Sequence, residues 1–471
     1  MNMGILHGES YKYSMEQLIQ LGSHSSVMQI RESDSLINQY QNKLFKVQLL
    51  PKVNMSATLP SLTNSISPIT INDGSEKFVN RFFMSSTLSL SLSQLIPFTG
   101  GTISLTSGLT RLDNFSPQRT KSFNLNLFNL SYSQSLFSFN SYRWEKKILK
   151  VKNELFKVSD IQRQEELNLN IVELFFDLYS AQKEIELNHS MIERAEKLLK
   201  KIQQLYENGK VSELAVLDAK IDLAKMKNTA TSIRQTQLQT EIASLLNLES
   251  KQLELIFDIN SFENISLRID KDLVISRALR FTQDLNRKAE SLQELHNIKE
   301  QKSAGYPIVS LSIGGGINSQ ADEFKNLTGL QSNSLSALVS INIPILSWNE
   351  NKFRVKMLEE TAKKNKIVAA QQNNRLIALY SYELDNLNLL IESAMIDKYT
   401  LEMLYKKYDK VMSNYESGKV DYSDIEETRN QIKQTEIQRI TKIKAFYSTV
   451  YRFRIDALYD IIENKAIDNI N

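Results

Sequence analysis

Few residues in this chain have the types and spacing that catalysis requires. The four histidines stand far apart, at positions 7, 24, 189 and 296, and the chain has no cysteine, so no cluster suited to a metal ion stands out. The triplet Gly314-Gly315-Gly316 lies in a segment with strand alternation and lacks the following helix that a phosphate-binding loop needs. We therefore predict a protein that is not an enzyme and that has no metal and no cofactor.

One short motif occurs twice and indicates an internal repeat. Tyr206-Glu207-Asn208-Gly209-Lys210-Val211 returns as Tyr415-Glu416-Ser417-Gly418-Lys419-Val420, an offset of 209 residues. The same offset carries residues 136–140 onto 345–349, so the 65 residues that follow match in length without a gap. Self-similarity at a fixed offset is typical of a duplicated unit, and we predict an internal twofold repeat.

Glycine and proline are nearly absent around each copy of the motif. From Gln118 to Ala304 the only glycine is Gly209, and from Ile345 to Asn471 the only one is Gly418. Because glycine readily takes the left-handed conformation at a helix end, each tract predicts two helices joined by a turn. The helix that ends at Glu207 would be roughly 100 Å long at about 1.5 Å per residue, which is far longer than helices of compact domains.

The charge balance gives no sign of a nucleic-acid-binding protein. Lysine and arginine total 57, aspartate and glutamate total 54, and no basic block stands out; such charges are expected on solvated helix faces. The absence of cysteine suits an oxidising compartment outside the cytoplasm. The first 14 residues show no signal peptide, and no run of 18 apolar residues predicts a membrane helix.

Five windows contain no charged residue, although the chain is 24% charged. Apolar and small polar residues alternate inside them, as in Leu88-Ser89-Leu90-Ser91-Leu92-Ser93, which is typical of strands. In a half-buried sheet of a soluble protein, charged residues would cover the wet face. An apolar face toward lipid and an uncharged polar face toward a lumen predict a transmembrane barrel instead. The windows are residues 53–72, 82–110, 122–142, 303–321 and 326–349.

The first set of strands is longer than the second. The proline that opens each set, Pro51 and Pro307, repeats at an offset of 256, so the first copy holds 256 minus 209, or 47, extra residues. They centre on the window 82–110, with Thr99-Gly100-Gly101 as the expected turn. We predict an added hairpin, and the sequence leaves open whether it joins the barrel, lengthens it or packs elsewhere.

The long helix of the first copy carries two apolar seams, which favour neighbours on both sides, as in a ring of helices. Polar residues interrupt the first seam at Asn188 and at its counterpart Asp397, and Glu383 stands opposite Leu174. The first seam is Leu167, Ile171, Leu174, Leu178, Ala181, Ile185, Ile192, Ala195, Leu199, Ile202 and Tyr206, and the second is Val172, Phe176, Tyr179, Leu187, Met191, Leu198 and Leu205.

These features divide the chain into eight segments. The shorter helices, taken in pairs, match the long ones in length, so their interruptions would meet as a belt. The segments are an N-terminal helix (1–50), first barrel strands with the extra hairpin (51–141), a first helical hairpin (142–246), an equatorial segment (247–271), a helix (272–305), second barrel strands (306–348), a second helical hairpin (349–460) and a tail (461–471).

The paired uncharged strands, the long helices, the duplicated Tyr-x-x-Gly-x-Val motif and the proline before each strand set resemble the TolC-like outer membrane efflux protein (outer membrane factor) family. The resemblance covers nearly the whole chain. It implies a homotrimer in which each protomer gives four strands to a shared 12-stranded β-barrel, continued by a periplasmic α-helical barrel. An oligomer is also what the physics of lipid requires, because an open sheet edge is not tolerated there.

The resemblance also assigns roles to individual residues. Gly209, Lys210 and Val211, with Gly418, Lys419 and Val420, would form tips that face a periplasmic adaptor protein, although they also read as plain helix turns. Asp424 and Glu427 would form a periplasmic gate, where three copies of a carboxylate pair favour cations; as parts of a solvated helix face they need no special role. Trp144 and Trp348, the only tryptophans, would mark the membrane interface or pack within the junction of strand and helix.

We therefore interpret the sequence as the outer membrane channel of a tripartite efflux or type I secretion system. Such a passive exit duct would lie in the bacterial outer membrane, with its helical part in the periplasm, and would contact an adaptor and an inner-membrane RND or ABC transporter. The alternative is an extracytoplasmic coiled-coil spacer or adhesin without a channel. That alternative explains the helices but not the five uncharged windows.

Overall fold

The computed structural model describes residues 11–70, 74–227, 231–248, 253–329, 331–417 and 419–467. The chain divides into two compact units. The first unit holds residues 1–37, 154–286 and 369–471, and the second holds residues 38–153 and 287–368. The long helices pass from one unit into the other, and each unit is described separately below.

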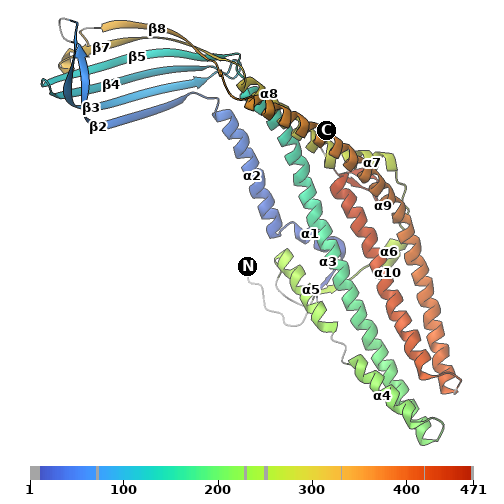
Figure 1. Cartoon of the computed structure of the whole chain (residues 1–471). Helices are drawn as coiled ribbons and strands as arrows, with labels where there is room; N and C mark the ends of the chain where they lie inside the picture. The colour runs from blue at the N-terminus through green and yellow to red at the C-terminus, as the bar shows by residue number, and fades with distance from the viewer. Residues whose placement is uncertain are drawn as a thin grey trace. The chain divides into compact units, whose positions relative to one another are not determined.

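The second unit is built on one antiparallel sheet of six strands in the order β2-β3-β4-β5-β7-β8 (Figure 1). The prediction of four strands per protomer is therefore wrong. The window predicted as an added hairpin lies in β3 and β4, which stand between β2 and β5 and are joined by a turn at residues 96–101. The strands are β2 (Lys52–Thr70), β3 (Glu76–Leu95), β4 (Thr102–Ser116), β5 (Thr120–Leu136), β7 (Ile308–Ala321) and β8 (Gln331–Asn342).

In two adjacent rows that cross all six strands, the register separates apolar from polar side chains. Residues that pair directly across the sheet share a face, and adjacent rows point to opposite faces. One row across the sheet is apolar, except for a glycine, and the next is uncharged and polar. The apolar row is Val53, Leu92, Leu105, Leu130, Gly315 and Leu335, and the polar row is Asn54, Ser91, Thr106, Asn129, Gly316 and Ser334.

The first unit is helical, and it contains the turns at the ends of the long helices. The two longest helices, α3 and α9, have 67 residues each. In the segment predicted as an N-terminal helix (1–50), the described residues 11–50 form β1 and two separate helices. Outside the six-stranded sheet, the helices and short strands of the two units are β1 (Tyr11–Tyr13), α1 (Met15–Gly22), α2 (Ser26–Val47), α3 (Ser141–Glu207), α4 (Glu213–Lys227), α5 (Thr231–Leu246), β6 (Leu253–Leu255), α6 (Ile259–Glu263), α7 (Lys271–Leu279), a π-helical turn (Arg280–Asp284) leading into α8 (Leu285–Ala304), α9 (Glu350–Glu416), α10 (Tyr422–Asp456), β9 (Tyr459–Asp460) and β10 (Lys465–Ala466). Almost all of α8 belongs to the second unit.

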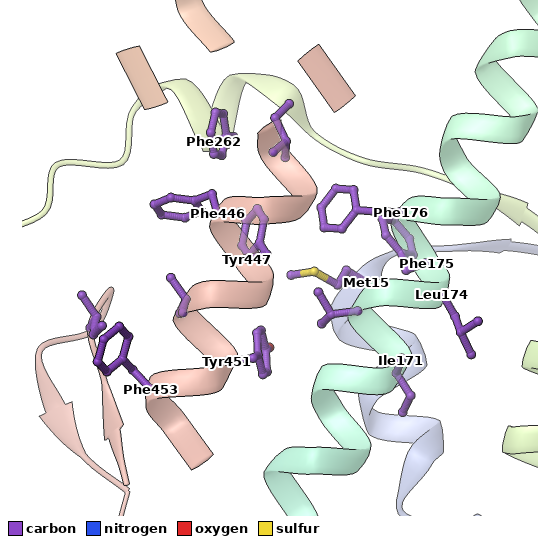
Figure 2. Packing of buried hydrophobic residues seen from close by; sticks show 14 of the residues in the cluster. Met15, Ile171, Leu174, Phe175, Phe176, Phe262, Phe446, Tyr447, Tyr451 and Phe453 are labelled. Carbon is purple, nitrogen blue, oxygen red and sulfur yellow. The ribbon is translucent and has the colours of Figure 1, made fainter. Parts of the chain in front are cut away.

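The largest core of the helical unit, here called the belt core, is rich in aromatic residues (Figure 2). Phe176 of α3 stacks on Tyr447 of α10 at 5.5 Å between ring centroids. Phe262 of α6 meets Phe446 edge to face at 5.3 Å. Such pairs add about 0.5–1.5 kcal/mol each beyond their burial. The short helix α6 therefore fastens the irregular segment between α5 and α7 onto the long helices.

Two of the three polar residues that interrupt the first seam and its counterpart, Asp397 and Glu383, form ion pairs in the structure. Asp397 is buried in α9, and its carboxylate accepts a hydrogen bond from Lys442 of α10 at 2.5 Å. Glu383 accepts one from Arg452 at 2.6 Å. These interruptions are ion pairs that join α9 to α10, because a buried charge needs a partner of opposite sign.

No helix in the described part of the chain is long and apolar enough to cross a membrane.

Gly316 of β7 offers a direct test of the sheet packing. A Cβ atom added there would collide with the backbone carbonyl of Phe128, next to the irregular register of β5, whereas a Cβ at Gly315 would meet its nearest neighbour at an ordinary 3.4 Å. We expect Gly316→Ala to destabilise the folded protein by about 1–3 kcal/mol, because the backbone must move to relieve the overlap. The measurement is thermal unfolding of detergent-purified protein, with Gly315→Ala as the matched control. Equal midpoints for the two variants would contradict the register described here.

Candidate functional site

The turn that ends α3 is closed by two backbone hydrogen bonds. Gly209 has a φ of 68°. Its N–H donates to the carbonyl of Tyr206 at 2.8 Å, and the N–H of Lys210 donates to that of Leu205 at 2.8 Å. This pair of bonds is the Schellman arrangement, which requires a left-handed residue after the helix. Gly209 therefore has a structural role, since it supplies the left-handed residue that this turn requires.

The second tip shows the same closing bond. The N–H of Lys419 donates to the carbonyl of Asn414 at 3.0 Å, across the same five-residue span. Gly418 lies outside the described residues. The two tips thus share the bond that closes the turn.

The remaining tip residues divide into two kinds. Lys210 and Lys419 are exposed. Val211 and Val420 are half-buried and pack on a second apolar cluster, here called the tip core. The lysines are therefore the tip residues that a partner can reach, and the valines hold the turns in place. The buried members of the tip core are Met191, Leu198, Ile202, Val216, Ala219, Leu401, Tyr408, Tyr415, Ile425 and Ile432.

Asp424 and Glu427 have different surroundings at the start of α10. The Asp424 carboxylate is half-buried and accepts a hydrogen bond from the backbone N–H of Asp421 at 3.1 Å. It therefore caps the helix by satisfying a donor that has no partner within the helix. Glu427 is exposed and accepts a hydrogen bond from the side chain of Gln431 at 2.9 Å.

A buried polar cluster, which the sequence reasoning missed, joins the two helical hairpins next to the tip core. Asp222 of α4 and Arg429 of α10 are 6% and 7% exposed. Arg429 donates from both terminal nitrogens to the two Asp222 oxygens, at 2.8 Å each. The Tyr422 hydroxyl donates to the same carboxylate at 2.7 Å. We call Asp222, Arg429 and Tyr422 the tip cluster.

Burial and charge set the protonation of the tip cluster. Burial raises the pKa of the Tyr422 phenol, and the hydrogen bond to Asp222 raises this pKa further. Burial alone would lower the pKa of Arg429, but its hydrogen bonds to Asp222 and the charge of that carboxylate hold the pKa above its usual value. Both donors therefore stay protonated, and a two-pronged guanidinium contact fixes the relative orientation of α4 and α10.

A signal for this cluster was present in the sequence. Arg429 follows Ile425 by four residues and precedes Ile432 by three, so it lies on the apolar face of its helix. Asp222 follows Ala219 by three residues in the same way. A charge on an apolar helix face indicates a buried partner, but spacing along one helix does not identify that partner.

The two tryptophans lie in different surroundings. Trp144, at the start of α3, stacks on Phe139 at 6.2 Å, and the Lys299 ammonium lies 4.9 Å from its ring. Trp348 is 81% exposed, with a φ of 48°. Trp144 is thus packed within its junction, whereas Trp348 offers its ring to the surroundings.

In the described residues, no group of three histidines, cysteines or acidic residues could hold a metal ion.

The chain thus combines a sheet that has adjacent apolar and uncharged polar rows across its strands with two helices of 67 residues each. Residues 274–445 match the family described as outer membrane efflux protein. No curated protein sequence matches the chain.

Solved structures of outer membrane channels share this fold at low sequence identity. CusC is 12% identical, with a TM-score of 0.66 over 94% of this chain and 91% of that chain. The Campylobacter jejuni outer membrane channel CmeC is 13% identical, with a TM-score of 0.62 over 94% and 85%. The Vibrio cholerae outer membrane protein VceC is 11% identical, with a TM-score of 0.62 over 96% and 97%.

These comparisons confirm the resemblance to the outer membrane efflux proteins that the repeated tip motif indicated. The similarity is to channels, which conduct and do not catalyse, in agreement with the prediction that the chain is not an enzyme.

The tip cluster allows a test of how the hairpins are tied together. Replacing Arg429 by Met leaves the buried Asp222 carboxylate without its counter-charge, and breaking such a pair costs about 3–5 kcal/mol. We expect Arg429→Met to speed hydrogen exchange in both α4 and α10, and the double change Asp222→Leu with Arg429→Met to reverse much of that effect. The exposed pair Glu350 and Arg354 provides the control, since Glu350→Gln should leave exchange in α4 unchanged. Equal exchange in the single and double variants would contradict a buried ion pair.

Proposed function

We propose that the protein is the outer membrane channel of a tripartite efflux or type I secretion system. In this proposal it is a trimer, and its long helices form a periplasmic tunnel. The channel is a passive exit duct that contacts a periplasmic adaptor and an inner-membrane RND or ABC transporter. The observation that carries the proposal is the division of the sheet into an apolar and an uncharged polar face.

The apolar face of the sheet supports a place in lipid. Val53 and Leu335 are both more than half exposed, and they lie in one apolar row on the two outermost strands. The opposite row carries Ser, Thr, Asn and Gly, which suits water inside a lumen. The six strands have 12 to 20 residues, and about 9–11 are enough to cross a bilayer.

The surface of α9 supports an assembly of several copies. Tyr382, Leu389, Ile396 and Met403 follow one another at intervals of seven residues and are exposed. A stripe with this period is typical of a helix packed against another helix. The buried stripe of α9, which includes Leu384, Leu387 and Ile391, is already covered within the chain, so the exposed stripe is available to a neighbouring copy.

The tip cluster supports a gate at the periplasmic end. Arg429 and Asp222 join the second hairpin to the first, so a movement that separates α10 from α4 has to break their contact. Asp424 and Glu427 lie on α10, as Arg429 does. Asp424 precedes Ile425 by one residue and Glu427 follows it by two, and Ile425 is a buried member of the tip core. Three copies of these carboxylates around an entrance would favour cations.

Two further sets of residues take roles in this proposal. Lys210 and Lys419 are exposed at the tips and would contact the adaptor, with Gly209, Val211 and Val420 holding the turns; Gly418 keeps its predicted place at the second tip. Trp348 would mark the membrane interface, where tryptophan is enriched, together with Trp144 in its packed junction.

A coiled-coil spacer or adhesin without a channel is the second candidate. The exposed seam of α9 fits either function. A spacer, however, leaves the apolar face of the sheet without a partner, and exposed patches of that kind cause aggregation in water. Extraction separates the two: a channel requires detergent and produces conductance steps in a planar bilayer, whereas a spacer dissolves in buffer.

The gate carries a prediction about ion preference. We expect Asp424→Asn with Glu427→Gln to weaken the cation preference of the channel in a planar bilayer, because the change removes six carboxylates from a threefold entrance. Glu290, an exposed residue of α8, provides the control variant Glu290→Gln, which should conduct like the unaltered protein. An unchanged reversal potential across a salt gradient would remove these two residues from the gate.

The tip lysines carry a prediction about coupling. We expect Lys210→Glu with Lys419→Glu to abolish export in cells while the protein still inserts in the outer membrane, since charge reversal at an exposed contact acts on the partner and not on folding. The matched control is Lys406→Glu, because Lys406 is an exposed residue of α9 that precedes the tip. Export at the normal level would mean that the adaptor binds elsewhere.

A further inference from the structure

The two outer strands of the sheet are open edges. The order of the sheet ends at β2 on one side and at β8 on the other, and neither pairs with a further strand in the described chain. Unpaired N–H and C=O groups cost several kcal/mol each in lipid, so a spanning sheet has to close. Six strands fall short of the eight found in the smallest membrane barrels.

The directions of these two strands allow copies of the chain to pair head to tail. Each strand is antiparallel to the one before it in the order of the sheet. The first and the sixth strands therefore run in opposite directions. When β8 of one copy lies beside β2 of the next, the junction is antiparallel like every other pair, and the repeated contact closes into a ring.

The side chains favour the same pairing. Val53 and Met55 of β2 lie on the face that carries Leu335, Val339 and Ile341 of β8, as the register across the four intervening strands shows. Head-to-tail pairing keeps this apolar face continuous around the ring. Pairing of β2 with β2 of another copy would also join the apolar faces but would leave two β8 edges open.

The hairpin of β3 and β4 is an integral part of the sheet. Its strands pair with β2 over 17 positions and with β5 over 12, and its apolar row continues that of its neighbours through Leu92 and Leu105. The hydroxyls of Ser56 and Ser89 lie 2.7 Å apart across β2 and β3, and those of Thr87 and Thr110 lie 3.2 Å apart across β3 and β4. The hairpin therefore adds to the circumference of the barrel.

We infer that β8 of each copy pairs with β2 of the next and that three copies close an 18-stranded barrel, three times the six strands of one chain. This inference rests on the proposed trimer and deepens it. The diameter of a barrel grows roughly in proportion to the number of strands, and barrels of about 16–18 strands leave an aqueous channel. The lumen is roughly one and a half times as wide as that of a 12-stranded barrel.

The polar row across the sheet affects which solutes can pass through the lumen of the proposed barrel. Its side chains are Asn, Ser, Thr and Gly on all six strands. A wide lumen lined in this way has no fixed charge at this level to select among solutes. At the level of this row, the lumen therefore admits bulky polar solutes of either charge, and selection falls to other parts of the channel.

Disulfide cross-linking tests the inference, and the absence of native cysteine leaves no background. Ser56→Cys with Ser89→Cys joins β2 to β3 in one chain and is the internal control. The test set places one cysteine on β2, at Asn54 or Ser56, and one on β8, at Ser334, Ser336 or Ser340, because the stagger at the junction selects the pair that reacts. We expect the control to react within a chain, and at least one test pair to give covalent dimers and trimers of the detergent-purified channel.

Each other outcome has a distinct meaning. If the trimer persists but Ser56→Cys reacts with Ser131→Cys of β5 and not with Ser89→Cys, the hairpin lies outside the barrel, and the 18-stranded arrangement is wrong while the proposed channel stands. If the test pairs give covalent dimers only, two copies close the ring, and both the 18 strands and the trimer are wrong. A monomer that dissolves without detergent would overturn the proposed function itself.

Discussion

In the proposed membrane channel, one requirement governs the sheet: every backbone polar group in lipid needs a hydrogen-bond partner. The five pairs of neighbouring strands satisfy these groups through antiparallel ladders. The outer edges of β2 and β8 have no such partner in the described part of one chain. The division into apolar and uncharged rows is the side-chain counterpart of the same constraint, since a charge on the lipid face is destabilising. The uncharged windows of the sequence and the need for further copies thus have one cause.

In the helical unit, the main constraint is that very long helices must keep one register relative to each other. An apolar seam permits sliding by a heptad, since its pattern repeats. Buried ion pairs oppose such sliding, because Lys442 bonds to Asp397 and Arg429 to Asp222, and a shift of one helix would break these contacts. The belt core adds large aromatic residues such as Phe446, which a heptad shift would displace. Polar interruptions of a seam therefore fix its register.

The sequence was informative where a residue pattern has a single physical cause. Alternation without charge located the strands, and the lone glycine at Gly209 located a turn, because both depend on local geometry. Sequence reasoning failed where two residues or strands that contact each other lie far apart in the chain. The hairpin of β3 and β4 alternates like any strand pair, so nothing in it shows that it separates β2 from β5. Likewise, Asp222 and Arg429 are 207 residues apart, and Asp424, placed at a gate, also proves to cap its own helix.

The contrast between the two cores indicates where the helices can move at low cost. Among the described residues, ten are buried in the tip core and 32 in the belt core, so separating the hairpins at their tips exposes much less apolar surface than separating them at the belt. The tip cluster does not make separation at the tips more costly than separation at the belt. Removing a buried ion pair from water offsets much of its attraction, and the contact between Arg429 and Asp222 therefore specifies one arrangement more than it stabilises it. Contacts of that kind suit an element that has two arrangements of similar free energy, because a partner that offers modest new contacts to Lys210 or Lys419 can shift the balance between them. In the proposed channel, the belt, with its aromatic packing, would stay in place while the tips respond to a partner.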